Sequence, residues 1–119
     1  MKMILRSFLL LFFLISSSHS QVRFSEDMPF LKARKLALEI GWQPYATQEV
    51  GRNGFPWSAA EKRMLDQGFA EISSCSEGET YCNFFYFREG KCLLLESKGE
   101  QLKFMRLAYW KVVPCPAKE

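Results

Sequence analysis

Four cysteines are the residues of this chain with the clearest chemistry: Cys75, Cys82, Cys92 and Cys115. An even number of cysteines in an exported chain predicts a disulfide framework, here of two bonds. Four cysteines allow three pairings, and sequence alone does not choose among them. We expect Cys75–Cys82, which closes a short polar loop, and Cys92–Cys115, which ties the C-terminal tail to a central strand. No C-x-x-C pair occurs, so the spacing disfavours the alternatives of a zinc site and a redox dithiol.

Histidine and the carboxylates, the other groups that often carry out catalysis, give little indication of a catalytic or metal site. His19 is the single histidine, and it lies in a segment that we expect to be removed, so a Ser-His or Cys-His hydrolase and a His-ligated metal are disfavoured. The acidic residues show no EF-hand spacing, and Glu77 and Glu79 are interpreted as parts of a solvated loop. Nucleophile-elbow and phosphate-loop motifs do not occur. We therefore expect no catalytic residue, no metal and no cofactor.

The N-terminus has the pattern of a cleaved secretory signal over residues 1–20. Lys2 and Arg6 form a basic start, an unbroken apolar run follows, and Ser18-His19-Ser20 fits the small-x-small rule for cleavage before Gln21. The apolar run is shorter than the roughly 20 residues of a membrane span, which disfavours the alternative of an uncleaved anchor. We expect an exported, periplasmic or secreted protein with no stable membrane span after cleavage.

The chain that remains after this cleavage is close to neutral. The full sequence holds 16 basic and 13 acidic residues. The signal removes two of the basic residues, which leaves a net charge of about +1, too small to attract nucleic acid or anionic lipid. Residues 21–28 show no periodicity and are predicted to be a loose leader. Residues 29–119 are predicted to form one small domain.

Two helices are predicted in the first half of this domain. Apolar residues recur at steps of three and four over residues 29–40, with Asp27 as a candidate cap. A second helix of about ten residues opens at Ser58, where Glu61 completes a capping box. A glycine follows each pattern and ends it.

The rest of the domain is predicted to be extended. Pro44 favours a short or edge strand over residues 42–47. The longer predicted strands are residues 69–75, 82–88, 91–97 and 101–113. Short turns containing glycine separate the later strands and indicate an antiparallel meander. The order predicts an α+β domain, with two N-terminal helices packed on one face of an antiparallel β-meander of about four strands, stabilised by disulfides.

The predicted strands carry more aromatic residues than one covered face needs. Strict alternation in the last strand places Leu107 and Tyr109 on one face, and Ala108 and Trp110 on the other. Since helices cover one face, we expect aromatic surface on the second face, where such surface often marks a binding site. The alternative is that these rings are ordinary core. The candidate partner-binding residues on the sheet are Phe85, Phe87 and Tyr109.

The loop of residues 49–57 is a second candidate site. Phe55 and Trp57 lie in it among glycines and a proline, and loops on rigid scaffolds often carry function. The alternative is structural, because Trp57 directly precedes the capping serine and suits a hydrophobic staple that fixes the entry to the helix.

A set of spaced residues runs through most of the mature chain: Ala33-Arg34, Leu38, Gly41-Trp42 with Pro44, Cys75-Ser76, Cys82 with Phe84 and Tyr86, and Trp110. This set resembles a group of small exported bacterial proteins to which no function is assigned. The loop between the first two cysteines is more acidic here than in that group. More loosely, the order of helices and meander is similar to the modules of secreted beta-lactamase inhibitory proteins and of small outer-membrane assembly lipoproteins, which implies protein binding rather than catalysis.

We therefore expect an exported, non-enzymatic domain that binds an unknown protein partner in the envelope or extracellular space, in an inhibitor- or immunity-like role. One alternative is a carrier of a small apolar ligand, which predicts a closed apolar cavity of at least about 300 Å³. The other is an envelope enzyme based on carboxylates, which predicts a cleft with convergent acidic side chains.

Overall fold

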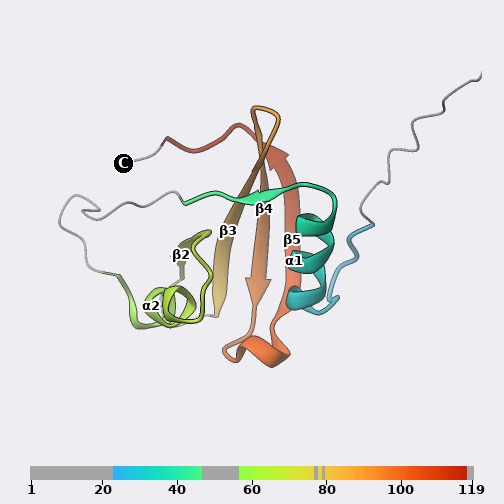
Figure 1. The fold of residues 1–119 in the computed structure, drawn as a ribbon. Coiled ribbons are helices and arrows are strands. Elements are labelled where there is room, and N and C mark those ends of the chain that lie inside the picture. The colour runs from blue at the N-terminus through green and yellow to red at the C-terminus, as the bar shows by residue number, and fades with distance from the viewer. Residues whose placement is uncertain (1–22, 47–56, 77, 79, 118–119) are drawn as a thin grey trace, which may run out of the picture.

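The computed structural model describes residues 23–46, 57–76, 78 and 80–117, arranged as Figure 1 shows. The elements in chain order are α1 (Phe30–Glu39), β1 (Gln43–Pro44), α2 (Ala59–Asp66), β2 (Ile72–Cys75), β3 (Tyr81–Arg88), β4 (Lys91–Lys98), the 3-10 turn η2 (Leu102–Phe104) and β5 (Arg106–Val113). Over these residues the chain is an α+β domain with two helices, an antiparallel sheet of five strands and two disulfides. The predicted fold class is therefore confirmed at that level, and the predicted signal of residues 1–20 lies outside the described residues.

Helix α1 forms where the apolar stripe predicts it, and its buried residues are Phe30, Ala33 and Ala37. The expected cap at Asp27 is wrong, because Pro29 is the N-cap residue and no side chain caps the helix. Instead, the Phe30 N–H donates to the Met105 carbonyl at 2.9 Å. The segment before β5 thus satisfies one of the N–H groups that a helix leaves free at its start.

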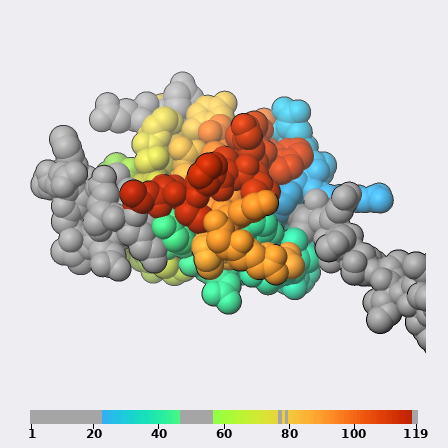
Figure 2. All heavy atoms as spheres, turned by 90° about the horizontal axis from the view of Figure 1, so that it is seen from above, coloured from blue at the N-terminus to red at the C-terminus, as the bar shows by residue number. Residues whose placement is uncertain are grey.

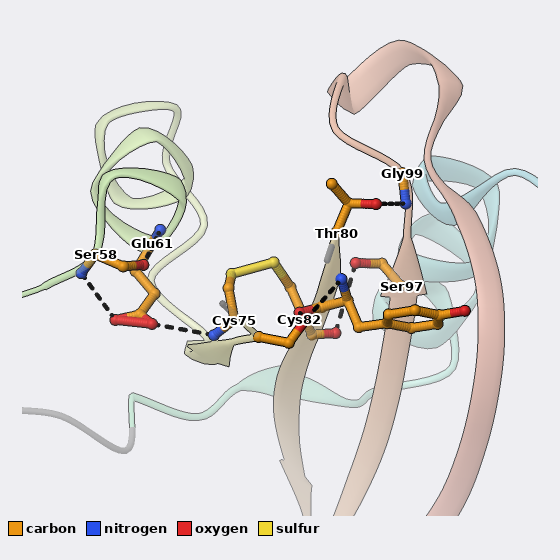
Figure 3. The surroundings of a disulfide bond; sticks show 9 residues. Ser58, Glu61, Cys75, Thr80, Cys82, Ser97 and Gly99 are labelled. Carbon is orange, nitrogen blue, oxygen red and sulfur yellow. Dashed lines mark hydrogen bonds between the residues drawn. A yellow bond between two sulfur atoms is a disulfide. The ribbon is translucent and has the colours of Figure 1, made fainter. Parts of the chain in front are cut away.

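Helix α2 has the predicted capping box. The Glu61 N–H donates to the Ser58 hydroxyl at 3.1 Å, and the Ser58 N–H donates to Glu61 Oε1 at 3.2 Å. Glu61 is only 4% exposed, and its other carboxylate oxygen accepts the Cys75 N–H at 3.0 Å. The same side chain therefore caps α2 and binds the end of β2, beside the Cys75–Cys82 disulfide (Figure 3).

The sheet is built around β3, which pairs with β4 on one side and with β1 and β2 on the other. β5 pairs with β4 and forms the opposite edge. The sequence predicts a meander of about four strands, and the two-residue β1 is the additional fifth strand of the sheet. The β3–β4 hairpin turns at Glu89 and Gly90, with φ angles of 49° and 79°, the left-handed conformation that tight two-residue hairpins use.

The last strand is shorter than the sequence predicts. Residues 101–113 have an extended pattern, but Leu102–Phe104 forms η2 and β5 begins only at Arg106. Residues i and i+3 of a 3-10 turn lie on the same side, which lets Leu102 and Met105 both pack against the core.

Both disulfides have the pairing that we expect from the sequence. Cys75 and Cys82 lie opposite each other in the β2–β3 ladder and are bonded. Cys92 of β4 is bonded to Cys115. Cys115 lies in the tail after β5, and we call residues 114–117 of this tail the C-terminal strap.

The described part of the predicted leader is docked on β5 rather than loose. The Asp27 N–H donates to the Leu107 carbonyl at 2.9 Å, and the Leu107 N–H donates to the Met28 carbonyl at 2.8 Å. Met28 is 8% exposed, and the ring centroids of Phe24 and Trp110 lie 5.9 Å apart. Backbone pairing and the burial of two apolar side chains hold this segment in place.

The hydrophobic core lies against one face of the sheet. The Phe84 ring of β3 lies 4.5 Å from the Phe30 ring and 6.2 Å from the Phe69 ring, measured between centroids. The sheet residues that join this core are Ile72, Cys82, Phe84, Tyr86, Leu93, Leu95 and Leu107. We call the face that carries them the core face and the opposite one the outer face.

Candidate binding surface

The outer face carries the aromatic residues that the sequence singles out on the sheet. Side chains alternate along a strand, and the burial of Phe84 and Tyr86 on the core face turns Phe85 and Phe87 to the outer face. Phe87 is 41% exposed, whereas Phe85, which pairs with Leu94 of β4, is half-buried.

A bulge in β5 sets the direction of Tyr109. Between the pairs that β4 makes with Leu107 and with Tyr109, Ala108 is an extra residue without a partner. The bulge shifts the alternation by one residue, so Trp110 pairs with the buried Leu95 and follows Leu107 onto the core face. Tyr109 then lies on the outer face, 46% exposed. The prediction that Leu107 and Tyr109 share a face is therefore wrong, because strict alternation does not take the bulge into account.

The C-terminal strap crosses one end of the outer face. Besides the disulfide to Cys92, the Tyr45 hydroxyl donates to the Pro116 carbonyl at 2.7 Å. The Tyr45 ring stacks on Phe87 with centroids 6.2 Å apart. Cys92 is fully buried although it pairs with Phe87 on the outer face. Figure 2, which looks down on this end of the molecule, shows the C-terminal residues, in red, running across the middle of the view. The strap therefore covers the hairpin end of the face and leaves the β5 side open.

Basic side chains border the open part of the outer face. Arg106 and Lys111 of β5 are exposed. Lys98 of β4 forms a hydrogen-bonded ion pair with Asp27 of the docked leader. The hydrogen bond to Asp27 raises the pKa of Lys98. Glu96 lies among these residues on β4, and Glu26 of the leader lines a hollow beside Tyr109. The β5 side of the outer face therefore carries charges of both signs, with the basic Arg106 and Lys111 on β5 itself.

The two candidate binding residues of the loop, Phe55 and Trp57, have different outcomes. Phe55 lies outside the described residues. Trp57 is described, is partly buried and packs against the hydrophobic core. This position favours the structural interpretation of Trp57 over a contact with a partner.

A partly buried ion pair, which the sequence does not predict, joins α1 to the segment before β2. Arg34 Nε donates to Glu71 Oε1 at 2.8 Å, and Arg34 Nη2 donates to Glu71 Oε2 at 3.2 Å. Glu71 is fully buried, and the guanidinium lies 4.5 Å from the Phe69 ring centroid. Burial alone would lower the pKa of Arg34, but the hydrogen bond and charge of Glu71 outweigh it and raise the pKa.

Tyr86 of β3 lies beside this pair and is fully buried. Its hydroxyl has no hydrogen-bond partner of good geometry among the described residues. Burial, and then the negative charge of Glu71, raise the pKa of Tyr86 well above its usual value of 10, while the nearby charge of Arg34 and a weak contact with it oppose the rise. The cluster is closed to solvent on the Glu71 and Tyr86 side, and we interpret it as structural.

Two hollows on the surface bear on the alternative functions. One, of about 490 Å³, lies between α2 and the β4–β5 connection, with Arg63 and Lys103 among its lining residues. The other, of about 530 Å³, lies beside the bulge and is lined by Glu26, Ala108, Tyr109 and Trp110. Both are open to solvent and have charged residues in their walls, unlike the closed apolar cavity that a carrier predicts.

The buried carboxylates are engaged in separate structural contacts, Glu61 with the α2 cap and Cys75, and Glu71 with Arg34. Within the described ranges, no three or more His, Cys, Asp or Glu side chains are placed to hold a metal ion. In the same part of the chain, no helix is long and apolar enough to cross a membrane.

Comparisons with protein-family models, with curated proteins and with solved structures found no match.

Proposed function

We propose that this protein is an exported, non-enzymatic domain that binds another protein through the outer face of its sheet, in an inhibitor- or immunity-like role. The observation that carries the proposal is the exposure of aromatic rings on that face, 41% for Phe87 and 46% for Tyr109. Large aromatic side chains dominate the binding energy of many interfaces. The proposal takes both helices to cover the core face, which leaves the outer face for a partner.

The chemistry of the face indicates the kind of partner. Phe85, Leu94 and Tyr109 supply apolar surface, and Arg106 and Lys111 supply positive charge beside it. A partner with an apolar centre and acidic groups at its border is complementary to this arrangement. Two disulfides suit an oxidising compartment, in agreement with the predicted signal and a periplasmic or secreted location.

The test is capture of a partner by oxidised mature protein, residues 21–119. The immobilised protein is exposed to envelope and culture-supernatant extracts of the source organism, and retained proteins are identified by mass spectrometry. The variant Phe85→Ala/Tyr109→Ala removes two rings from the outer face. A matched control, Leu31→Ala/Phe104→Ala, removes side chains that are 41% and 69% exposed on α1 and η2.

We expect one protein that wild type and control retain and the outer-face variant loses. Thermal unfolding of each variant shows that the fold persists. Capture by all three proteins alike would move the site away from the outer face, and no captured protein would refute the binding function.

A further inference from the structure

The edge strand β5 is only half covered. Its first half pairs with the docked leader through the backbone of Leu107 and through a bridge between Pro29 and Arg106. The backbone pairing of the leader with β5 ends at Asp27, which has a left-handed φ of 66°, while the Phe24 ring of the leader packs against the Trp110 side chain. From Ala108 to the end of β5, no described residue pairs with the side of the strand that faces away from β4.

The backbone groups left open on this edge belong to Trp110 and Val112. Leu107 exchanges hydrogen bonds with the leader, so its N–H and C=O point away from β4. Groups alternate along a strand, and the bulge at Ala108 shifts the alternation by one. Trp110 and Val112 therefore present an N–H and a C=O each at the edge, in the direction that Leu107 uses to bind the leader.

The side chains around this edge are apolar and exposed. Val112 is 51% exposed and Tyr109 is 46% exposed. The hollow of about 530 Å³ lies where this backbone pairing ends, with Glu26 of the leader and Ala108, Tyr109 and Trp110 of β5 in its wall. This combination offers backbone hydrogen bonds beside a space for one apolar side chain.

We propose that the open half of β5 accepts an extended, acidic segment of the partner protein, which adds to the sheet as a strand where the leader stops. The inference rests on the proposed protein-binding function and names how the partner binds. Strand addition obtains affinity from main-chain hydrogen bonds and specificity from alternate side chains. The leader shows that this edge already pairs with an extended segment.

The charge of Lys111 selects an acidic side chain in the added segment. Lys111 lies on this half of β5, is exposed and pairs with the apolar Leu94 of β4. The acidic Glu96 and Glu26 lie further along, opposite Tyr109 and in the wall of the hollow. An acidic side chain directly opposite Lys111 therefore meets a positive charge, and a basic one is repelled.

Lys111 also disfavours a second copy of this chain as the occupant. Two copies that paired antiparallel with Trp110 of each opposite Val112 of the other, the register that uses all the open backbone groups, would place the two Lys111 side chains opposite each other about the two-fold axis. Like charges directly opposite in a ladder are destabilising, and an edge lysine is a common protection against self-pairing.

The test uses nuclear magnetic resonance of the oxidised mature protein and two blocked hexapeptide probes. One probe alternates valine with glutamate, and the other alternates valine with lysine. The variant Val112→Pro removes an N–H that points away from β4, a position where an edge strand tolerates proline. Val112→Ala is the matched control, because it shortens the side chain and keeps the N–H.

The glutamate probe should shift the Trp110 amide signal to saturation and leave the Leu107 signal, which is already bonded to the leader, in place. The lysine probe should bind at least about tenfold more weakly. Val112→Pro should abolish the shift while Val112→Ala retains it. An unshifted Trp110 signal at about 1 mM glutamate probe, the weak end of binding, would overturn the inference, as would equal binding of both probes or concentration-dependent dimerisation of the free protein.

Extract capture separates the failure of this inference from the failure of the proposed function. A partner retained equally by wild type and Val112→Pro, but lost by Phe85→Ala/Tyr109→Ala, would overturn strand addition and leave the outer face as the site. A partner lost by Val112→Pro and retained by Val112→Ala would support strand addition.

Discussion

Replacing Arg34 by methionine should destabilise the protein far more than the loss of a surface charge. Glu71 is fully buried, and Arg34 donates to its two oxygens at 2.8 and 3.2 Å. Arg34→Met leaves this carboxylate buried without a cation, which costs about 3–5 kcal/mol of unfolding free energy. Methionine replaces much of the apolar stem of arginine, so lost packing adds little to this cost.

Urea unfolding of the oxidised protein, followed by tryptophan fluorescence, measures the loss. A domain of this size has a total stability of about 5–15 kcal/mol, so the variant loses a large share of it. The thermal midpoint should fall by roughly 4–8 °C for each kcal/mol. Circular dichroism before unfolding confirms that the variant is folded at the start.

Two further variants serve as controls. Lys35→Met changes the next residue of α1, whose side chain is 78% exposed and lies 4.0 Å from Glu39, and should cost less than about 0.5 kcal/mol. Arg34→Met/Glu71→Leu removes both charges of the pair and should recover most of the loss. A cost of Arg34→Met below about 1 kcal/mol, which is typical of exposed pairs, or a double variant no more stable than the single one, would refute the argument.

Three other predictions concern stability. Burial raises the pKa of Tyr86 in the folded protein, so ionisation of its hydroxyl opposes folding. The folded protein therefore keeps its full stability below the unfolded pKa of about 10 and loses stability as the pH rises above that value. Tyr86→Phe should remove this loss in chemical unfolding between about pH 8 and pH 11, and equal slopes for both proteins would contradict it. Ser58→Ala should cost about 1 kcal/mol in urea unfolding through the lost cap, and an unchanged midpoint would exclude a stabilising role. A Cβ on Gly99 would lie 3.2 Å from the Met105 Cα, whereas one on Gly90 meets nothing within 4 Å, so Gly99→Ala should lower the thermal midpoint more than Gly90→Ala; the reverse order would contradict this.

The features that the sequence predicts well are those with local signals. The capping box at Ser58 depends on residues three apart, and the two-residue turn before Lys91 depends on its own glycine. The docked leader has no such signal, because its pairing with Leu107 joins segments that are distant in the chain. Burial of Phe24 and Met28 against β5 is likewise a tertiary property.

The candidate surface shows the same division. Alternation in β3 correctly turns Phe85 and Phe87 away from the core residues beside them. In β5 the extra residue of the bulge puts Leu107 and Tyr109 on opposite faces, and no residue type in the strand predicts the bulge. The ion pair of Arg34 and Glu71 joins residues 37 positions apart, so periodicity alone could not find it.

The Cys92–Cys115 bond determines how a mechanical load on the C-terminus would enter the domain. A pull on the tail passes through the sulfurs into β4, which lies between β3 and β5, and bypasses β5. The disulfide prevents the segment between the two cysteines, which are 23 residues apart, from being pulled out into an extended chain. The unfolded protein is therefore shorter by about 80 Å, at roughly 3.3–3.6 Å per residue. Tension at this end therefore acts on the interior of the sheet and does not peel the edge strand away.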